Sequence, residues 1–93
     1  STLMQTITGV VPGAYTVSVR AKKTGADYTS YFRVQYNGNK YAYLFSTTET
    51  FGWTEYSAVI DDVQDGTIIV CAYNRLATLM LHGRFSHEKE KGQ

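Results

Sequence analysis

Apolar and polar residues alternate along almost the whole chain, and no window of about ten residues carries the apolar stripe of an amphipathic helix. The clearest segment is Ala14–Lys22, in which Tyr15, Val17, Val19 and Ala21 would share one face of a strand. The intervening residues are polar or charged, which is the pattern of an antiparallel strand with one buried face. This periodicity restricts the chain to architectures made of sheets.

Further segments of this kind follow at short intervals, separated by residues that favour turns. Between two of them, Asn37-Gly38-Asn39 is a strong hairpin signal. We therefore predict an all-β protein without significant helix, an antiparallel β-sandwich of about seven strands. The expected strands are Leu3–Thr8, Ala14–Lys22, Ser30–Tyr36, Lys40–Ser46, Trp53–Ile60, Thr67–Asn74 and Thr78–Ser86, with connections at Thr47–Gly52 and Asp61–Gly66.

A chain of 93 residues has material for a single hydrophobic core, so we expect one domain over residues 1–87 and a charged tail over residues 88–93. Thr67–Asn74 is apolar almost throughout, which is typical of a central strand buried on both faces. The residues expected in the core are Ile7, Tyr15, Val17, Val19, Phe32, Val34, Trp53, Ile68, Val70, Leu79 and Leu81.

Charge and hydropathy exclude two classes of partner. The formal net charge is +1 and Lys and Arg do not cluster, so we expect no nucleic-acid binding, which depends on grouped cations. The longest apolar runs fall far short of the roughly 20 residues of a membrane-spanning helix, so we expect no membrane attachment.

Catalytic and metal-binding patterns are weak. Cys71 is the only cysteine and lies in an apolar run, so we expect a buried structural thiol. His82 and His87 are not spaced as a ligand pair, and no Ser-His-Asp order or phosphate-binding loop is recognisable, so we expect no zinc and no enzyme.

Calcium is the one metal that the sequence raises as an alternative. Asp61, Asp62 and Asp65 lie close together, but two or three carboxylates fill only part of its coordination shell. A turn explains Asp65-Gly66 without metal. We therefore expect no cofactor, with calcium as the minor alternative.

The hairpin around Asn37-Gly38-Asn39 carries the most informative side chains. Tyr31, Arg33 and Gln35 share one face of its first strand, and aromatic residues occupy alternate positions of its second strand. A two-residue loop would send these aromatics into the core, whereas a three-residue loop would place them beside Arg33, because a shift of one residue moves every side chain to the other face. The second-strand aromatics are Tyr41, Tyr43 and Phe45.

Sugar recognition needs flat aromatic rings for stacking and planar groups that hydrogen-bond to hydroxyls, all on one rigid surface. The three-residue register would supply both. The candidate ligand-binding residues are therefore Tyr31, Arg33, Gln35, Tyr41 and Tyr43, with the rings stacking and Arg33 and Gln35 contacting hydroxyls.

Two segments resemble carbohydrate-binding modules of the jelly-roll, galactose-binding-like type. The segment Gln5–Val19 has the strand, Gly-x-x-Pro-Gly turn and Tyr-Thr-x-Ser strand of such modules, and Gly52–Ser57 has a Trp followed by Tyr-Ser. The Pro-Gly turn is also similar to fibronectin type III, but there a Trp strand comes before it, whereas Trp53 comes after it here. The resemblance implies a jelly-roll-like sandwich, non-catalytic carbohydrate binding and an extracellular or virion-surface setting.

Such modules usually begin with an additional N-terminal strand, and none precedes Ser1 in this chain. An incomplete sheet leaves unpaired N–H and C=O groups that favour pairing with another chain. The alternative function is therefore a structural or oligomerisation domain of a virion or surface assembly, such as a phage tail fibre or capsid-decoration protein. In that alternative a homo-oligomer or a neighbouring chain completes the sheet.

Overall fold

The computed structural model describes residues 2–26, 28–74 and 79–89, with side chains up to residue 74. In this part of the chain there are seven β-strands and no helix. The strands are β1 (Thr2–Thr8), β2 (Gly13–Lys23), β3 (Ser30–Tyr36), β4 (Lys40–Thr47), β5 (Phe51–Val63), β6 (Thr67–Asn74) and β7 (Leu79–Lys89). No helix in the described residues is long and apolar enough to cross a membrane.

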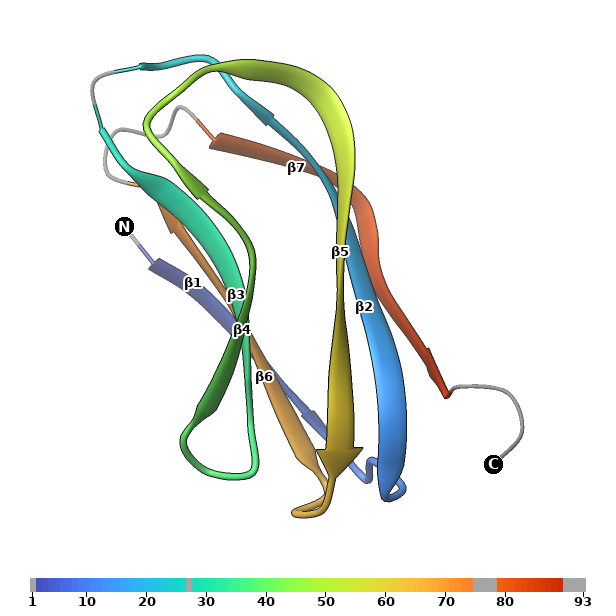
Figure 1. Ribbon diagram of the computed structural model, residues 1–93. Coiled ribbons are helices and arrows are strands. Elements are labelled where there is room, and N and C mark those ends of the chain that lie inside the picture. Colours follow the sequence, from blue (N-terminus) through green and yellow to red (C-terminus); the bar gives the residue numbers. More distant parts are fainter. Residues whose placement is uncertain (1, 27, 75–78, 90–93) are drawn as a thin grey trace.

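The strands form two antiparallel sheets that face each other (Figure 1). One sheet has the order β1-β6-β3-β4 and the other the order β5-β2-β7. Every connection except the β3–β4 hairpin crosses from one sheet to the other, so neighbours within a sheet are mostly distant in sequence. The expectation of an antiparallel, jelly-roll-like β-sandwich is confirmed.

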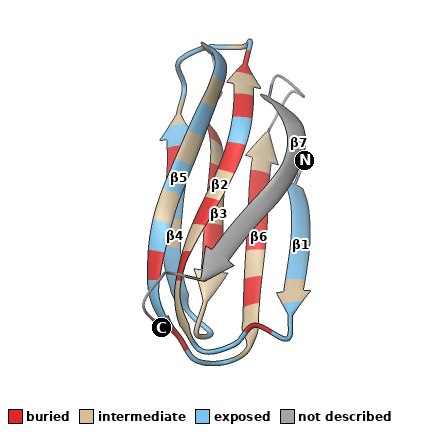
Figure 2. Cartoon of the chain, turned by 90° about the vertical axis from the view of Figure 1, so that its right-hand side faces the viewer, coloured by how far each residue is buried: buried red, intermediate tan, exposed pale blue. Residues whose placement is uncertain are grey.

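The core lies between the sheets and is built from the central strands β2, β3 and β6, while β1 and much of β5 are exposed (Figure 2). The expected core residues Tyr15, Val17, Val19, Phe32, Val34, Ile68 and Val70 are buried, and Ile7 is partly buried against them. The side chains of Leu79 and Leu81 lie outside the described residues.

The prediction that Trp53 is a core anchor is wrong, because its side chain is 41% exposed. Tyr56 pairs with Val19 and Thr54 with Ala21, and both partners on β2 point into the sandwich. Trp53 comes one residue before Thr54 and therefore points outward.

Phe51, at the start of β5, packs its ring against the core in place of Trp53. It lies in contact with two other rings, at centroid distances of 5.4 Å from Phe45 and 5.3 Å from Tyr56. At a register shift between Ala21 and Lys23, the two β5 residues Gly52 and Trp53 lie opposite the single residue Lys22. This bulge directs the side chain of Phe51 inward.

Several strand boundaries differ from those expected. β5 begins at Phe51 and continues to Val63, and β7 continues to Lys89, into the segment expected as a tail. β5 contains a bulge, in which Asp61 and Asp62 lie opposite the single residue Ala14, and its pairing with β2 resumes at Val63. The bulge allows both Ile60 and Val63 to point inward with no exposed area, and Asp62 adopts a φ of 56°. Thr78, the expected start of the last strand, lies outside the described residues.

The β3–β4 hairpin has a three-residue loop, since Tyr36 pairs with Lys40. Asn37 and Gly38 adopt φ values of 50° and 79°, a region that Asn tolerates and Gly enters without steric cost. The side-chain nitrogen of Asn37 donates to the backbone carbonyl of Asp62 over 2.8 Å, and its side-chain oxygen accepts from the backbone N–H of Gln64 over 2.7 Å. The loop is thereby attached to the β5–β6 turn.

A bulge in β4 separates Tyr43 from Phe45. Tyr43 pairs with Arg33 and Phe45 with Phe32, which leaves Leu44 as the extra residue. Phe45 therefore points into the core, where it is 8% exposed, and not onto the outer face with Tyr43 as the three-residue register alone implied.

Lys23 closes one end of the sandwich. Its side chain is 1% exposed, and its ammonium donates to the Thr48 carbonyl over 3.0 Å and to the carbonyl of Gly25. These bonds connect the end of β2 with the loops before β3 and before β5, because a buried ammonium must be hydrogen-bonded.

We predict that Asn37→Ala lowers the free energy of unfolding by about 1–3 kcal/mol, because it removes the two hydrogen bonds that attach the loop. Alanine also tolerates a positive φ less well than asparagine, whose side chain can form hydrogen bonds to nearby backbone groups. Asn39→Ala, in the same loop and exposed, should change it by less than about 0.5 kcal/mol. Urea denaturation of both variants measures the difference. Equal effects would show that the tether does not hold the hairpin.

We also predict that Phe51→Ala destabilises the protein by about 2–4 kcal/mol and that Trp53→Ala costs at least about 1 kcal/mol less. The two positions are in the same strand, but Phe51 packs in the aromatic cluster and Trp53 lies on the outer surface. Thermal or urea unfolding compares them. A larger loss for Trp53→Ala would place Trp53 in the core after all.

Candidate functional site

The outer face of the four-stranded sheet carries the candidate residues of the hairpin. Strand register arranges its side chains in rows that cross all four strands. The central row contains Met4, Cys71, Arg33 and Tyr43. The flanking rows are Thr2, Tyr73, Tyr31 and Ser46 on one side and Thr6, Ile69, Gln35 and Tyr41 on the other.

Arg33 lies at the centre of this face with tyrosine rings around its guanidinium. Its Cζ is 4.7 Å from the ring centroid of Tyr41, 5.4 Å from that of Tyr31 and 6.0 Å from that of Tyr43. Its Nη1 also donates to the Tyr43 hydroxyl over 3.2 Å. Its Nε is enclosed and has no hydrogen-bond partner among the described residues, so the ring faces provide the attraction there.

Tyr31 connects two other rings of the face. It stacks on Tyr73 with a centroid distance of 5.2 Å and an interplanar angle of 15°, and it meets Tyr43 edge-on at 5.6 Å. Side-by-side rings on a rigid sheet form an ordered aromatic surface, because few rotamers remain open to each ring. We call the set Tyr31, Arg33, Gln35, Tyr41, Tyr43 and Tyr73 the aromatic platform.

The structure brings together all five candidate residues of the hairpin. Tyr41 is 48% and Tyr43 50% exposed, while Tyr31, Arg33 and Gln35 are half-buried. The amide nitrogen of Gln35 donates to the Gly38 carbonyl, which holds this side chain at the loop end of the platform. The rings of Tyr41 and Tyr43 are therefore accessible at the surface, and contacts within the sheet hold Tyr31 and Arg33 beside them.

Tyr73 is a platform residue that the sequence pattern did not indicate. It was expected in a strand buried on both faces, but only the inner residues of β6 and its centre are buried, and Tyr73 near its end is half-buried. Tyr73 pairs with Tyr31 across β3 and β6. This pairing joins residues far apart in the chain, and the sequence contains no signal for it.

Among the described residues in the rows of this face, Arg33 is the only one with a charged side chain. Its hydrogen bond to Tyr43 raises the pKa of the guanidinium above its ordinary value, so it stays charged at any physiological pH. No Asp or Glu of the described residues occupies a position in the rows of the face. The positive charge is therefore not neutralised by a carboxylate on the described part of this surface.

Cys71 lies between Met4 and Arg33 in the central row of this face. It is a free thiol and is 5% exposed. The expectation of a buried thiol is confirmed, but its place in the row directs the side chain to the outer face and not to the core between the sheets.

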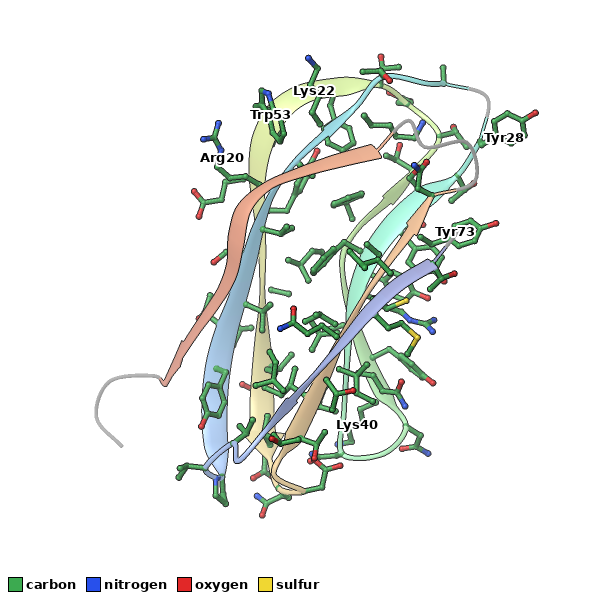
Figure 3. The ribbon with its side chains drawn as sticks, turned by 180° about the vertical axis from the view of Figure 1, so that it is seen from behind. Arg20, Lys22, Tyr28, Lys40, Trp53 and Tyr73 are labelled. Carbon is green, nitrogen blue, oxygen red and sulfur yellow. The ribbon has the colours of Figure 1, made fainter. Side chains whose placement is uncertain are left out.

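The opposite outer surface, on the three-stranded sheet, has one aromatic residue with a cationic neighbour. Arg20 lies 5.9 Å above the Trp53 ring. Figure 3 shows Arg20, Lys22 and Trp53 on one side of the molecule and Tyr73 on the other. The described side chains of this surface, those of β2 and β5, form no row of tyrosines like those of the platform.

The described residues contain no group of three or more His, Cys, Asp or Glu side chains that could hold a metal ion. Two of the three aspartates considered for calcium have hydrogen-bonding roles. Asp65 accepts from the backbone amides of Gly38 and Thr67, and Asp62 accepts from the Gln64 side chain. The side chains of His82 and His87 lie outside the described residues.

Fold and site together define a β-sandwich with a rigid, solvent-accessible aromatic face on one sheet. Comparisons of the chain with protein-family models, with curated proteins and with solved structures found no significant match. The carbohydrate-binding family expected from the sequence stays a prediction.

We predict that Cys71 reacts slowly with a thiol-specific reagent in the native protein and that Arg33→Ala increases the rate by about tenfold or more, because the large side chain directly beside the buried thiol is removed. Arg20→Ala, on the other sheet, should leave the rate unchanged. Absorbance-detected labelling in buffer measures the rates, with circular dichroism to confirm folding. A fast reaction in the unaltered protein would contradict the covered position of Cys71.

Proposed function

We propose that this protein is a non-catalytic carbohydrate-binding domain and that the aromatic platform is its glycan-binding face. One observation carries the proposal: exposed tyrosine rings surround an arginine on one flat sheet surface, held by contacts within the sheet. Sugar rings present apolar C–H faces that stack on aromatic rings and hydroxyls that pair with planar polar groups.

Each part of the platform has a distinct role in this proposal. Tyr41 and Tyr43 stack on sugar rings, because half of each side chain is accessible. Arg33 and Gln35 hydrogen-bond to hydroxyls, since Arg33 has donors beyond the single one used by Tyr43. Tyr31 and Tyr73 support the surface from the side through their stacked rings.

Arg33 favours glycans with acidic groups. Its charge has no carboxylate partner among the described residues of the face, and a guanidinium binds a carboxylate or sulfate through charge-assisted hydrogen bonds. A uronic-acid polymer should therefore bind more tightly than a neutral polysaccharide of the same linkage type, and added salt should reduce the difference.

The test is a glycan array followed by affinity electrophoresis in gels containing neutral or uronic-acid polysaccharides. We expect Tyr41→Ala and Arg33→Ala each to weaken binding by about tenfold or more, because stacking or charge-assisted bonds are lost. Arg33→Gln should remove the preference for acidic polymers more than it weakens binding to neutral ones.

Trp53→Ala is the matched control, because it removes an exposed aromatic ring from the other sheet. It should leave glycan binding unchanged. Binding that survives both platform substitutions but is lost in Trp53→Ala would move the site to the three-stranded sheet. Retention of no glycan by the folded protein would refute the proposed function.

A further inference from the structure

Strand β1 differs from the other edges of the two sheets. Among the described strands it pairs only with β6, so no described strand pairs with the N–H and C=O groups on the other side of its backbone. All of its residues except the half-buried Ile7 are exposed, and Leu3 and Met4 are each 59% exposed. Such an edge is a template on which another strand can pair.

Devices that usually protect an edge strand are missing from β1. It contains no charged residue, Pro or Gly, and its seven pairs with β6 follow one another without a register shift. The other edges each have an interruption: β4 has the bulge at Leu44 and packs against β5, β5 has two register shifts, and β7 has one shift in its pairing with β2.

The sequence of β1 is complementary to itself in antiparallel orientation. Consider two copies of β1 that pair with Gln5 of one opposite Gln5 of the other. In this register Leu3 lies opposite Ile7 of the second copy, Met4 opposite Thr6, and Thr2 opposite Thr8. This register uses the whole strand and matches the inward-facing residues of one copy with those of the other. It places apolar side chains opposite each other and no like charges.

A groove beside β1 supports the same arrangement. It has a volume of about 230 Å³ and is lined by apolar residues of the inner face, including Phe32 and Val70, together with Leu3 and Gln5 of β1. Ile7 of a second copy, opposite Leu3, would lie at the open side of this groove. The net charge of +1 does little to oppose such an association.

We propose that two copies of this chain pair through β1 in an antiparallel, two-fold symmetric register centred on Gln5, which forms one continuous sheet across both copies. Pairing about Gln5 places the outer faces of both four-stranded sheets on the same side. The two aromatic platforms then form one extended surface, and if they bind glycan as proposed above, a polymer contacts both and binds with avidity.

The first test is cross-linking. Gln5→Cys should form an intermolecular disulfide under mild oxidation, because directly opposed residues of an antiparallel pair have a Cα distance of about 4.5–5.5 Å, which a disulfide can span. Thr8→Cys is the matched control, since the two cysteines would be roughly 20 Å apart in this register. The unaltered protein controls for Cys71.

The second test is light scattering after size-exclusion chromatography over a concentration series. We expect twice the chain mass at high concentration, and Gln5→Lys should weaken the dimer by about tenfold or more because it opposes two like charges. Ser57→Lys, exposed on the other sheet, should not affect it. Monomer at every concentration, equal cross-linking at positions 5 and 8, or a dimer insensitive to Gln5→Lys would each overturn the proposal.

These measurements need no sugar, so their failure is distinct from failure of the proposed function. A dimer that binds no glycan would leave the β1 pairing intact and refute only carbohydrate binding. If both proposals hold, Gln5→Lys lowers affinity for an immobilised polysaccharide by no more than the factor by which it weakens the dimer, while affinity for a short oligosaccharide in solution is unchanged.

Discussion

The attachment of the β3–β4 loop to the β5–β6 turn is the constraint on which the candidate site depends. Asn37 bridges to the Asp62 carbonyl and the Gln64 amide, and Asp65 accepts from the Gly38 amide. These bonds hold a three-residue loop, which pairs Gln35 with Tyr41. With one residue fewer in the loop, Tyr41 and Tyr43 would point between the sheets, and the outer face would keep only the rings of Tyr31 and Tyr73 among those of the platform.

Bulges then distribute the aromatic residues between the core and the surface. Strict alternation along β4 would place Phe45 outside with Tyr43, and the extra residue Leu44 returns Phe45 to the core. Bulges in β5 do the same for Phe51 and Val63. The loop length therefore places Tyr41 and Tyr43 on the platform, and the bulges supply the core with Phe45 and Phe51.

The platform and the β1 edge belong to the same sheet, which relates the two proposals physically. Stacking and hydrogen bonds to single sugars are individually weak, so a domain with one small flat face gains most from repetition. Pairing through β1 would repeat the face without altering any residue of it, because β1 contributes only small, uncharged side chains and Met4 to the outer surface.

The sequence by itself determined the all-β class, the hairpin, the inner face of β2 and the alternation of side chains along each hairpin strand, because a period of two residues and turn-forming residues are local properties. It left the hairpin register open and placed Trp53 in the core. Only the tertiary structure decided the loop length, the position of Phe45, and the pairing of Tyr73 with Tyr31. Each of these depends on contacts between strands distant in the chain, which local alternation does not encode.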